Sequence, residues 1–380
     1  MKKILAMLLA LSMIFALAAC GETAPAETKP AEEPAAEAPA EEPAAAPEEP
    51  AEETAPEAPA EEAPAEEVPA EAAYKLGLGV SLNMDSSKTG NAQVDATTAA
   101  VILDEQGKIV AVKIDVAQNK MDITDGAVDT EKEFLTKAEL GDDYNMVKFS
   151  DATLEWYQQA AAFEEYVIGK TADEVAGMET VVNEEGHQVT TDEALYASCS
   201  ISIGDFKEAV VKACNDEQAA TFAGAGGFSL GLAIISKSDE STAATAEEDG
   251  VVKMYSEYAA VVVDGDGVIL AAVTDATQPQ IKINAAGEIV ETTFKGTKRE
   301  LKEDYNMVKF SDATLEWYQQ AKNFTDYATG KTAEELRATE TKTNDEGHNV
   351  FVDETLYASV SISIDGMINV VAKAADNALA

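Results

Sequence analysis

The residue types best suited to ligand binding gather in one short window that occurs twice. Asp143 to Ala160 returns without change as Asp304 to Ala321, and each copy holds a lysine followed by one of the chain's two tryptophans. A Trp–Tyr pair beside a lysine can form a stacking wall for a planar or sugar ligand. The same pair can instead anchor a helix in a core, because adjacent helical side chains point about 100° apart. The candidate binding residues in this window are Lys148, Trp156, Tyr157, Lys309, Trp317 and Tyr318.

Two cysteines in the first copy are poor material for a metal site. Cys199 and Cys214 are fifteen residues apart, and no CxxC or CxxH spacing accompanies them. Such spacings are typical of zinc and iron–sulfur sites. The matching positions of the second copy are apolar, Val360 and Ala375. We therefore expect two buried free thiols rather than a disulfide.

The two histidines give no catalytic pattern. His187 and His348 occupy one repeat position beside a glycine turn, with no second histidine or cysteine nearby. We interpret them as exposed turn residues. No nucleophile elbow, zinc-protease or phosphate-loop motif stands in the strand–turn–helix context that would support it. We predict no catalytic residues, no metal site and no enzymatic activity.

The N-terminal residues predict export. Lys2 and Lys3 precede an apolar stretch from Ile4 to Ala16 that is too short to span a bilayer. The following Leu17-Ala18-Ala19-Cys20 resembles the lipobox of bacterial lipoproteins. This resemblance implies that residues 1–19 are a signal peptide and that Cys20 carries a diacylglycerol. Acyl chains would then anchor the protein to the extracytoplasmic face of the cell membrane.

A segment of extreme composition follows, from residue 20 to residue 73. Residues 21–73 contain 17 glutamates, a single lysine and 11 of the 12 prolines, with a net charge of −16. With almost no large apolar side chain to bury, the segment cannot offset its ordering entropy. We predict a disordered linker that reaches at most about 160 Å from the membrane.

The charge of the whole chain limits its partners. A formal net charge of −44 repels nucleic acid and anionic headgroups. We expect the membrane to be a partner only through the lipid anchor. The remaining candidates are a small-molecule ligand or a cell-envelope component, and no nucleic acid is expected.

The internal repeat defines the organisation of the rest. The two copies of the identical window are 161 residues apart. The same offset carries Gly169 to Ala172 onto Gly330 to Ala333. Each unit has the size of an ordinary globular domain, which is much longer than one solenoid repeat. We predict repeat domain 1 at residues 74–219 and repeat domain 2 at residues 223–380.

Each unit is expected to begin with strands. A short strand over Leu76–Leu82, or Ser229–Ile235, precedes two apolar runs separated by a turn. The turn residues are Asp104 to Gly107 in the first unit and Asp264 to Gly267 in the second, and Asp and Gly favour a hairpin there. The second unit adds a hairpin around Asn284-Ala-Ala-Gly287.

Helices are expected to follow. Ser150 or Asp151 can cap a helix through Val167, and Thr171 and Thr332 each begin a capping-box pattern. An alternating strand through Ser200–Ile203 and a helix over Phe206–Ala213 complete the unit. This order predicts an α+β fold of two tandem copies, each a mainly antiparallel sheet with packed helices, preceded by the disordered tether.

One family resemblance bears on function. Ala100 to Ile109 is similar to the opening hairpin of the FMN-binding domain of extracytoplasmic proteins, and Ala197 to Ile203 resembles its closing Ser-Gly-Ala-Thr-x-Thr-Ser motif. The resemblance implies that Ser200 and Ser361 stand where the family's threonine carries FMN through a phosphoester. In this chain Ser198-Cys199 replaces the motif's Gly-Ala, and serine replaces the modified threonine.

Two functions follow as hypotheses. The first is a lipid-anchored surface protein whose two modules bind FMN or another small ligand, for extracellular electron transfer or ligand capture. The second is a non-catalytic structural or protein-interaction module of the cell envelope without a cofactor.

Overall fold

The computed structural model describes residues 72–224 and 227–380, which belong to one compact unit. The predicted signal peptide, Cys20 and all but the end of the predicted tether lie outside the described residues. Within the described part, no helix is long and apolar enough to cross a membrane. The α+β class and the mainly antiparallel sheets with packed helices are confirmed.

The first repeat builds one four-stranded antiparallel sheet. Its strands, in the spatial order β3-β2-β1-β6, are β1 (Ala72–Asn83), β2 (Asn91–Leu103), β3 (Ile109–Asp122) and β6 (Ala220–Gly224). The predicted turn at Asp104 to Gly107 joins β2 to β3, and the Asp104 carboxylate accepts the amides of Gln106 and Lys108 there. That turn sets the register of the long hairpin, which buries nearly every residue of β2.

In the second repeat, the strands that correspond to the long β2–β3 hairpin are divided between two sheets. The first, β10-β9-β7, contains β7 (Phe228–Lys237), β9 (Tyr255–Asp264) and β10 (Ile269–Thr277). The second, β12-β11-β8, contains β8 (Gly250–Lys253), β11 (Gln280–Ile283) and β12 (Ile289–Thr293). Pro279 stands between β10 and β11 and has no amide to donate to a ladder, which explains the interruption. The predicted hairpin at Asn284 to Gly287 is confirmed.

Helices and one short hairpin follow the strands in each repeat. In the first repeat they are α1 (Lys137–Leu140), η1 (Gly141–Tyr144), α2 (Met146–Phe149), α3 (Trp156–Val167), α4 (Ala172–Ala176), β4 (Thr180–Val182), β5 (Gln188–Thr190), α5 (Glu193–Tyr196) and α6 (Gly204–Cys214). In the second they are α7 (Lys298–Leu301), η2 (Lys302–Tyr305), α8 (Met307–Phe310), α9 (Trp317–Ala328), α10 (Ala333–Arg337), β13 (Thr341–Thr343), β14 (Asn349–Phe351), α11 (Glu354–Ser359) and α12 (Asp365–Asn377).

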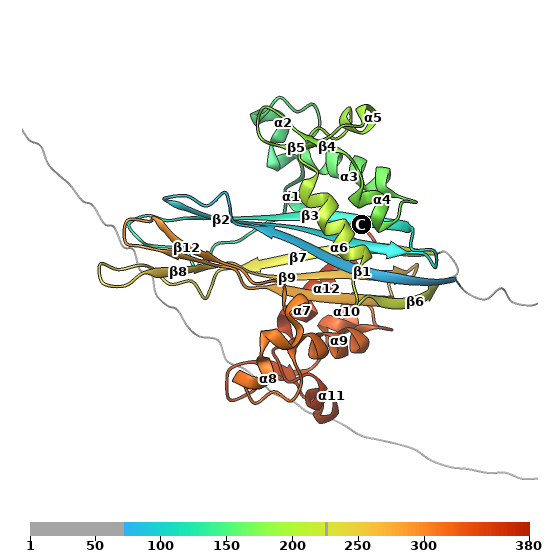
Figure 1. Cartoon of the computed structure of the whole chain (residues 1–380). Coiled ribbons are helices and arrows are strands. Elements are labelled where there is room, and N and C mark those ends of the chain that lie inside the picture. The colour runs from blue at the N-terminus through green and yellow to red at the C-terminus, as the bar shows by residue number, and fades with distance from the viewer. Residues whose placement is uncertain (1–71, 225–226) are drawn as a thin grey trace, which may run out of the picture. The chain divides into compact units, whose positions relative to one another are not determined.

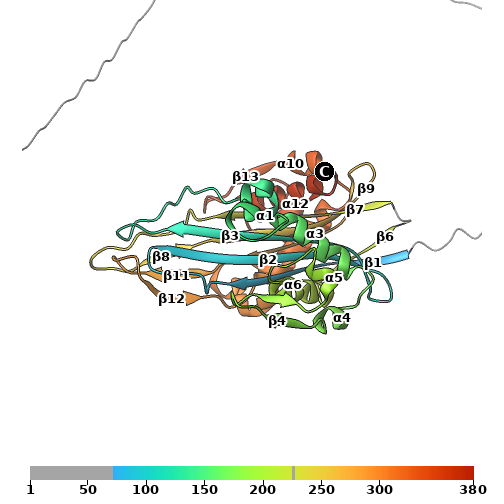
Figure 2. The ribbon, with the colours of Figure 1, turned by 90° about the horizontal axis from the view of Figure 1, so that it is seen from above.

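The two repeats pack sheet against sheet, with their helices on the outer faces (Figure 1). The shared core between the sheets contains Leu76 and Leu78 of β1 together with Leu230 and Leu232 of β7. Each outer face has a core of its own beneath its helices. Viewed from above, the long strands of both sheets run in similar directions (Figure 2). The result is four layers in the order helix, sheet, sheet, helix.

Contacts between the repeats follow an approximate twofold symmetry. Lys212 of α6 pairs with Glu300 of α7 at 3.1 Å, and Lys373 of α12 forms the equivalent ion pair with Glu139 of α1. The last helix of each repeat, α6 or α12, also lies directly on a glycine of its own sheet. A Cβ added at Gly231 would overlap the backbone carbonyl of Ala374, just as one added at Gly77 would overlap that of Ala213. The repeats therefore meet as the two halves of a symmetric dimer would.

Two local predictions are wrong. The helix expected to be capped by Ser150 or Asp151 begins at Trp156, because the Glu155 carboxylate is committed to the amides of Met146 and Val147 and to the helix start. Ser200–Ile203 forms no strand and leads instead into α6, whose position agrees with the predicted helix. The capping boxes at Thr171 and Thr332 are confirmed.

Candidate ligand-binding site

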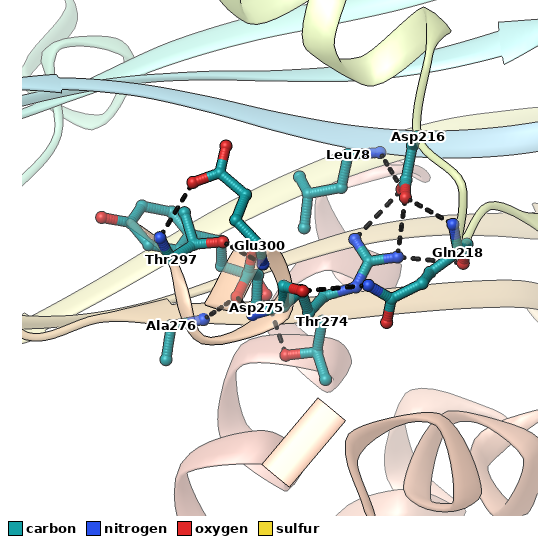
Figure 3. A network of polar contacts seen from close by, with 10 residues as sticks. Leu78, Asp216, Gln218, Thr274, Asp275, Ala276, Thr297 and Glu300 are labelled. Carbon is teal, nitrogen blue, oxygen red and sulfur yellow. Dashed lines mark hydrogen bonds and ion pairs between the residues drawn. The ribbon is translucent and has the colours of Figure 1, made fainter. Parts of the chain in front are cut away.

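The site is built around a short helix, α7, which an aspartate holds on the sheet β10-β9-β7. The Thr297 hydroxyl accepts the Glu300 amide and begins the helix. Asp275 of β10 accepts the amides of Arg299 at 3.1 Å and of Ala276 at 2.7 Å (Figure 3). Burial raises the pKa of Asp275 to about 6, although Arg299 opposes the shift. This arrangement fixes the first residue of α7, Lys298, over β9.

Lys298 is a buried cation with few partners. Its side chain is 7% exposed, and its Nζ lies 4.9 Å from the ring centre of Tyr255 and 5.1 Å from those of Tyr305 and Trp317. Such contacts stabilise an ammonium. Nζ donates a single long hydrogen bond, 3.5 Å to Tyr255 Oη. Among the described residues no carboxylate oxygen lies within 4.0 Å of it.

The surroundings of Lys298 leave hydrogen-bonding capacity unused. Burial lowers its pKa to about 8, and Glu257 is the largest charge opposing that shift. An ammonium has three donor hydrogens, and an unsatisfied buried donor is costly. Lys298 can therefore offer two further hydrogen bonds to an acceptor that enters from outside the fold.

An open cleft of about 950 Å³ gives access to this lysine. Its buried lining includes Lys298 and Trp317, whereas its exposed lining comes from the loop after α8 and from the turn between β13 and β14. The start of α12 completes the wall. The size matches the range of small-molecule sites, roughly 300–1,000 Å³.

The charge of the cleft differs between its buried and exposed parts. In the buried part, Glu257 is the largest charge that acts on Lys298, and burial raises the pKa of Glu257. The exposed part also contains two residues that already have ion-pair partners, Lys237 with Asp239 and Glu240 with Lys253. Its other exposed carboxylates are Asp312, Asp345 and Glu346. Among the described residues, no lysine or arginine pairs with Asp312, Asp345 or Glu346, and the ion-pair contact of the Glu346 carboxylate is with His348 at 3.9 Å. The exposed part of the cleft is therefore a region of unbalanced negative charge.

The first repeat has a related arrangement. Lys137 of α1 is the counterpart of Lys298, and its Nζ lies 5.0 Å from the ring centre of Tyr144 and 5.5 Å from that of Trp156. Burial lowers the pKa of Lys137 as well. Its neighbours on the strand differ. Upstream of the helices the repeats align with an offset of 160 residues, which carries Val101 onto Val261 and places Asp95 at the position of Tyr255. The two repeats thus share the caged lysine but not its polar surroundings.

The structure separates the residues predicted from the identical window. Trp156 and Trp317 are core anchors, and Trp317 also lines the cleft. Tyr157 and Tyr318 point away from their tryptophans and donate to Asp142 and Glu303, respectively. The ammonium groups of Lys148 and Lys309 lie over the rings of their neighbours Phe149 and Phe310. The Trp–Tyr pair does not form a common stacking wall.

The two serines have equivalent positions. The Ser200 amide and hydroxyl both donate to Gln159 of α3, and those of Ser361 both donate to Gln320 of α9. Ser361 lines the cleft. Each serine therefore ties the loop before the last helix to the helix that carries the tryptophan.

The two lysines, Lys137 and Lys298, are not among the binding residues predicted from the sequence. Lys137 and Lys298 follow Thr136 and Thr297 in the repeated pattern Thr-Lys-x-Glu-Leu. The lysines stand six residues before the identical window begins. Extending the repeat upstream would have identified them. Nothing in the sequence indicates the role of Tyr255, because the first repeat has an aspartate there.

The histidines and Cys199 have the exposure predicted for them, whereas Cys214 is only partly buried. His187 and His348 are exposed on turns beside Gly186 and Gly347. Cys199 and Cys214 are free thiols, and burial raises the pKa of each to about 12. Within the described residues, no three acidic, histidine or cysteine side chains converge as a metal site would require.

The cleft does not suit a covalently bound FMN. Its volume is sufficient, and Ser361 stands at its wall. A phosphate on Ser361, however, would share the cleft with Glu257, Asp365 and the exposed carboxylates. Glu257 also occupies the space beside Gly366, in the first turn of α12, where helix amides would otherwise favour an anion. The donors present therefore do not fit a phosphate dianion.

Comparisons with known proteins give one partial relationship. No protein-family model matches the chain, and no solved structure matches it. A protein of Desulfitobacterium hafniense named chlorophenol reductase is 33% identical over 123 residues, which cover 27% of this chain and 38% of that protein. The chain thus spans well under half the length of this relative. The relative's name stands against the expectation that the chain has no enzymatic activity.

Proposed function

We propose that this chain is a lipid-anchored protein of the extracytoplasmic membrane face whose second repeat captures a small organic ligand in the cleft above Lys298. The observation that carries the proposal is the ammonium of Lys298, which is buried beside three aromatic rings and holds a single long hydrogen bond. A ligand acceptor would supply the partner that the fold does not supply. The N-terminal pattern through Cys20 supports the anchoring part of the proposal.

Ligand capture needs no chemistry from the protein itself. The side chains around the cleft can bind and orient a ligand, but they include no nucleophile activated by a base. We therefore favour a binding protein over a catalyst. Flavin attachment at Ser361 is not part of this proposal, because the charges of the cleft oppose a phosphate there.

A second candidate is a role in reduction, which the name of the partial relative favours. In that case the captured ligand would be a redox group. Native protein would then absorb visible light and change its spectrum on reduction.

Native mass spectrometry of protein purified from its own membranes tests capture. We expect a non-covalent adduct that an Ala358→Trp variant loses, because the exposed Ala358 lines the cleft and a Trp side chain would fill it. Ala197→Trp, at the equivalent exposed position of the first repeat, is the matched control and should retain the adduct. An adduct that survives Ala358→Trp would refute the proposed site.

The anchor requires a separate experiment. A Cys20→Ser variant should lose the mass of the diacylglycerol and leave the membrane fraction, because one thiol carries the attachment. Retention of this variant in the membrane fraction would contradict the proposed anchor.

A further inference from the structure

Two features of the cleft call for opposite charges on one ligand. Lys298 is more than nine-tenths buried, and it has donor hydrogens without a partner. Asp312, Asp345 and Glu346 are exposed in the lining and have no lysine or arginine partner among the described residues. A single small molecule can satisfy both features only if it presents an acceptor oxygen at one end and a cation at the other.

A metal ion does not explain the exposed carboxylates. In the part of the chain that the structure describes, no three potential ligands lie close enough together to hold one. Carboxylates that are spread along a cleft suit an organic cation. Its charge is distributed over a larger group than a metal ion and needs no fixed coordination geometry. The same carboxylates would repel a purely anionic ligand.

The dimensions favour an elongated molecule. The cleft of about 950 Å³ extends from the aromatic side chains around Lys298 to the turn between β13 and β14. Aromatic and apolar lining residues, among them Trp317, Tyr357 and Met367, can cover the uncharged middle of a ligand. Specific polar contacts would then be confined to its two ends.

We infer that the cleft of the second repeat binds an elongated zwitterion, of the kind that a free dipeptide exemplifies, with its carboxylate at Lys298 and its ammonium among Asp312, Asp345 and Glu346. This inference rests on the proposed capture function and specifies its ligand class. It also distinguishes the repeats, because Asp95 replaces Tyr255 beside the lysine of the first repeat.

Three related peptides separate the contributions of the two charges. The probes are alanyl-phenylalanine, its N-acetyl derivative and its C-terminal amide, each titrated calorimetrically into the full chain. Loss of one well-placed charge contact is worth about tenfold in Kd. We expect the free dipeptide to bind about tenfold more tightly than either derivative. Tighter binding of either derivative would overturn the zwitterion assignment while leaving the capture proposal intact.

Variants assign each end of the ligand to its part of the cleft. Asp312→Asn combined with Asp345→Asn should abolish the preference for the free dipeptide over the N-acetyl form. Lys298→Met should abolish its preference over the amide. The charge-matched control is Asp151→Asn combined with Glu184→Gln at the equivalent positions of the first repeat, and it should change Kd less than about twofold, because long-range charges are screened by salt.

The remaining outcomes are also decisive. An equal loss of affinity in the control pair would attribute binding to the general acidity of the chain and overturn the inference. The absence of heat with all three peptides would also overturn it. The adduct experiment with Ala358→Trp would then decide the capture proposal independently.

Discussion

At the scale of single residues, adjacent cations in α7 have opposite surroundings. Arg299 has a countercharge within the fold: it makes a bidentate pair with Asp216 at 3.0 Å for each contact and donates to the Gln218 carbonyl. Lys298 has three aromatic rings and one long hydrogen bond. Arg299 therefore serves the fold, whereas Lys298 retains capacity for a ligand. Position in the sequence does not distinguish the two, because their partners come from distant strands and turns.

Glu164 of α3 gives a prediction at this scale. Burial raises the pKa of the Glu164 carboxyl to about 7. The hydrogen bond that the carboxylate accepts from the Ile114 amide at 2.6 Å opposes this shift. The folded state thus keeps a proton between pH 4.5 and 7 that the unfolded state has released, so stability falls as pH rises through this window. Glu164→Gln should raise the free energy of unfolding at pH 8 by on the order of 2 kcal/mol and change it little at pH 4.5.

Urea unfolding at the two pH values measures this effect. Glu165→Gln removes the same charge at the exposed neighbouring position and should have little effect at either pH. Equal effects of the two variants at pH 8 would contradict the role given to burial. The second repeat has Thr325 at the position of Glu164, so the effect belongs to the first repeat alone.

At the scale of elements, α7 is held by both repeats. Asp275 supports it from its own sheet, and Asp216, which follows α6 of the other repeat, binds Arg299 (Figure 3). Asp216 also accepts the Leu78 amide of β1 at 3.1 Å. The helix that presents Lys298 to the cleft is therefore positioned partly by the first repeat.

Breaking this contact should be costly. The Arg299 and Asp216 side chains are each 8% exposed, so Asp216→Asn leaves a buried guanidinium without its countercharge. We expect a loss of about 3 kcal/mol in the free energy of unfolding. The adjacent pair between Glu217 and Lys302 is exposed, so Glu217→Gln should cost less than about 1 kcal/mol. Chemical denaturation measures the free energy of unfolding of both variants. Similar losses in the two would contradict the larger contribution to stability that we assign to Asp216.

The sequence predicts an element well where the contacts that determine it lie between neighbouring residues. The hairpin turns and the capping boxes at Thr171 and Thr332 depend on neighbouring residues, and the structure contains them. The start of α3 differs from the prediction because Glu155 accepts hydrogen bonds from residues nine and eight positions earlier, which helical periodicity does not reveal. The loop at Ser200 alternates like a strand, yet it is fixed by the distant Gln159. The cleft escaped prediction for the same reason.

At the scale of the whole described unit, the two repeats share one core. Residues of β1 and β2 pack against residues of β7 and β9, so neither sheet would remain covered on both faces if its partner unfolded. The reciprocal pairs of Lys212 with Glu300 and of Lys373 with Glu139 add polar contacts at the same junction. We expect the repeats to unfold together.

The placement of one tryptophan in each repeat allows a direct test. In a Trp156→Phe variant the fluorescence reports on the second repeat, and in Trp317→Phe it reports on the first. In each variant the denaturation midpoint by fluorescence should coincide with the midpoint by far-ultraviolet circular dichroism. Separate midpoints in either variant would show that the repeats unfold independently.

The central claim is that the cleft of the second repeat is the ligand site, and hydrogen exchange of the full chain tests it most directly. Saturating alanyl-phenylalanine should slow exchange in residues 307–317, 342–348 and 357–367, which contain most of the cleft lining. The equivalent residues 146–156, 181–187 and 196–206 of the first repeat should exchange as they do without peptide. Equal protection in both repeats, or protection confined to the first, would contradict the claim.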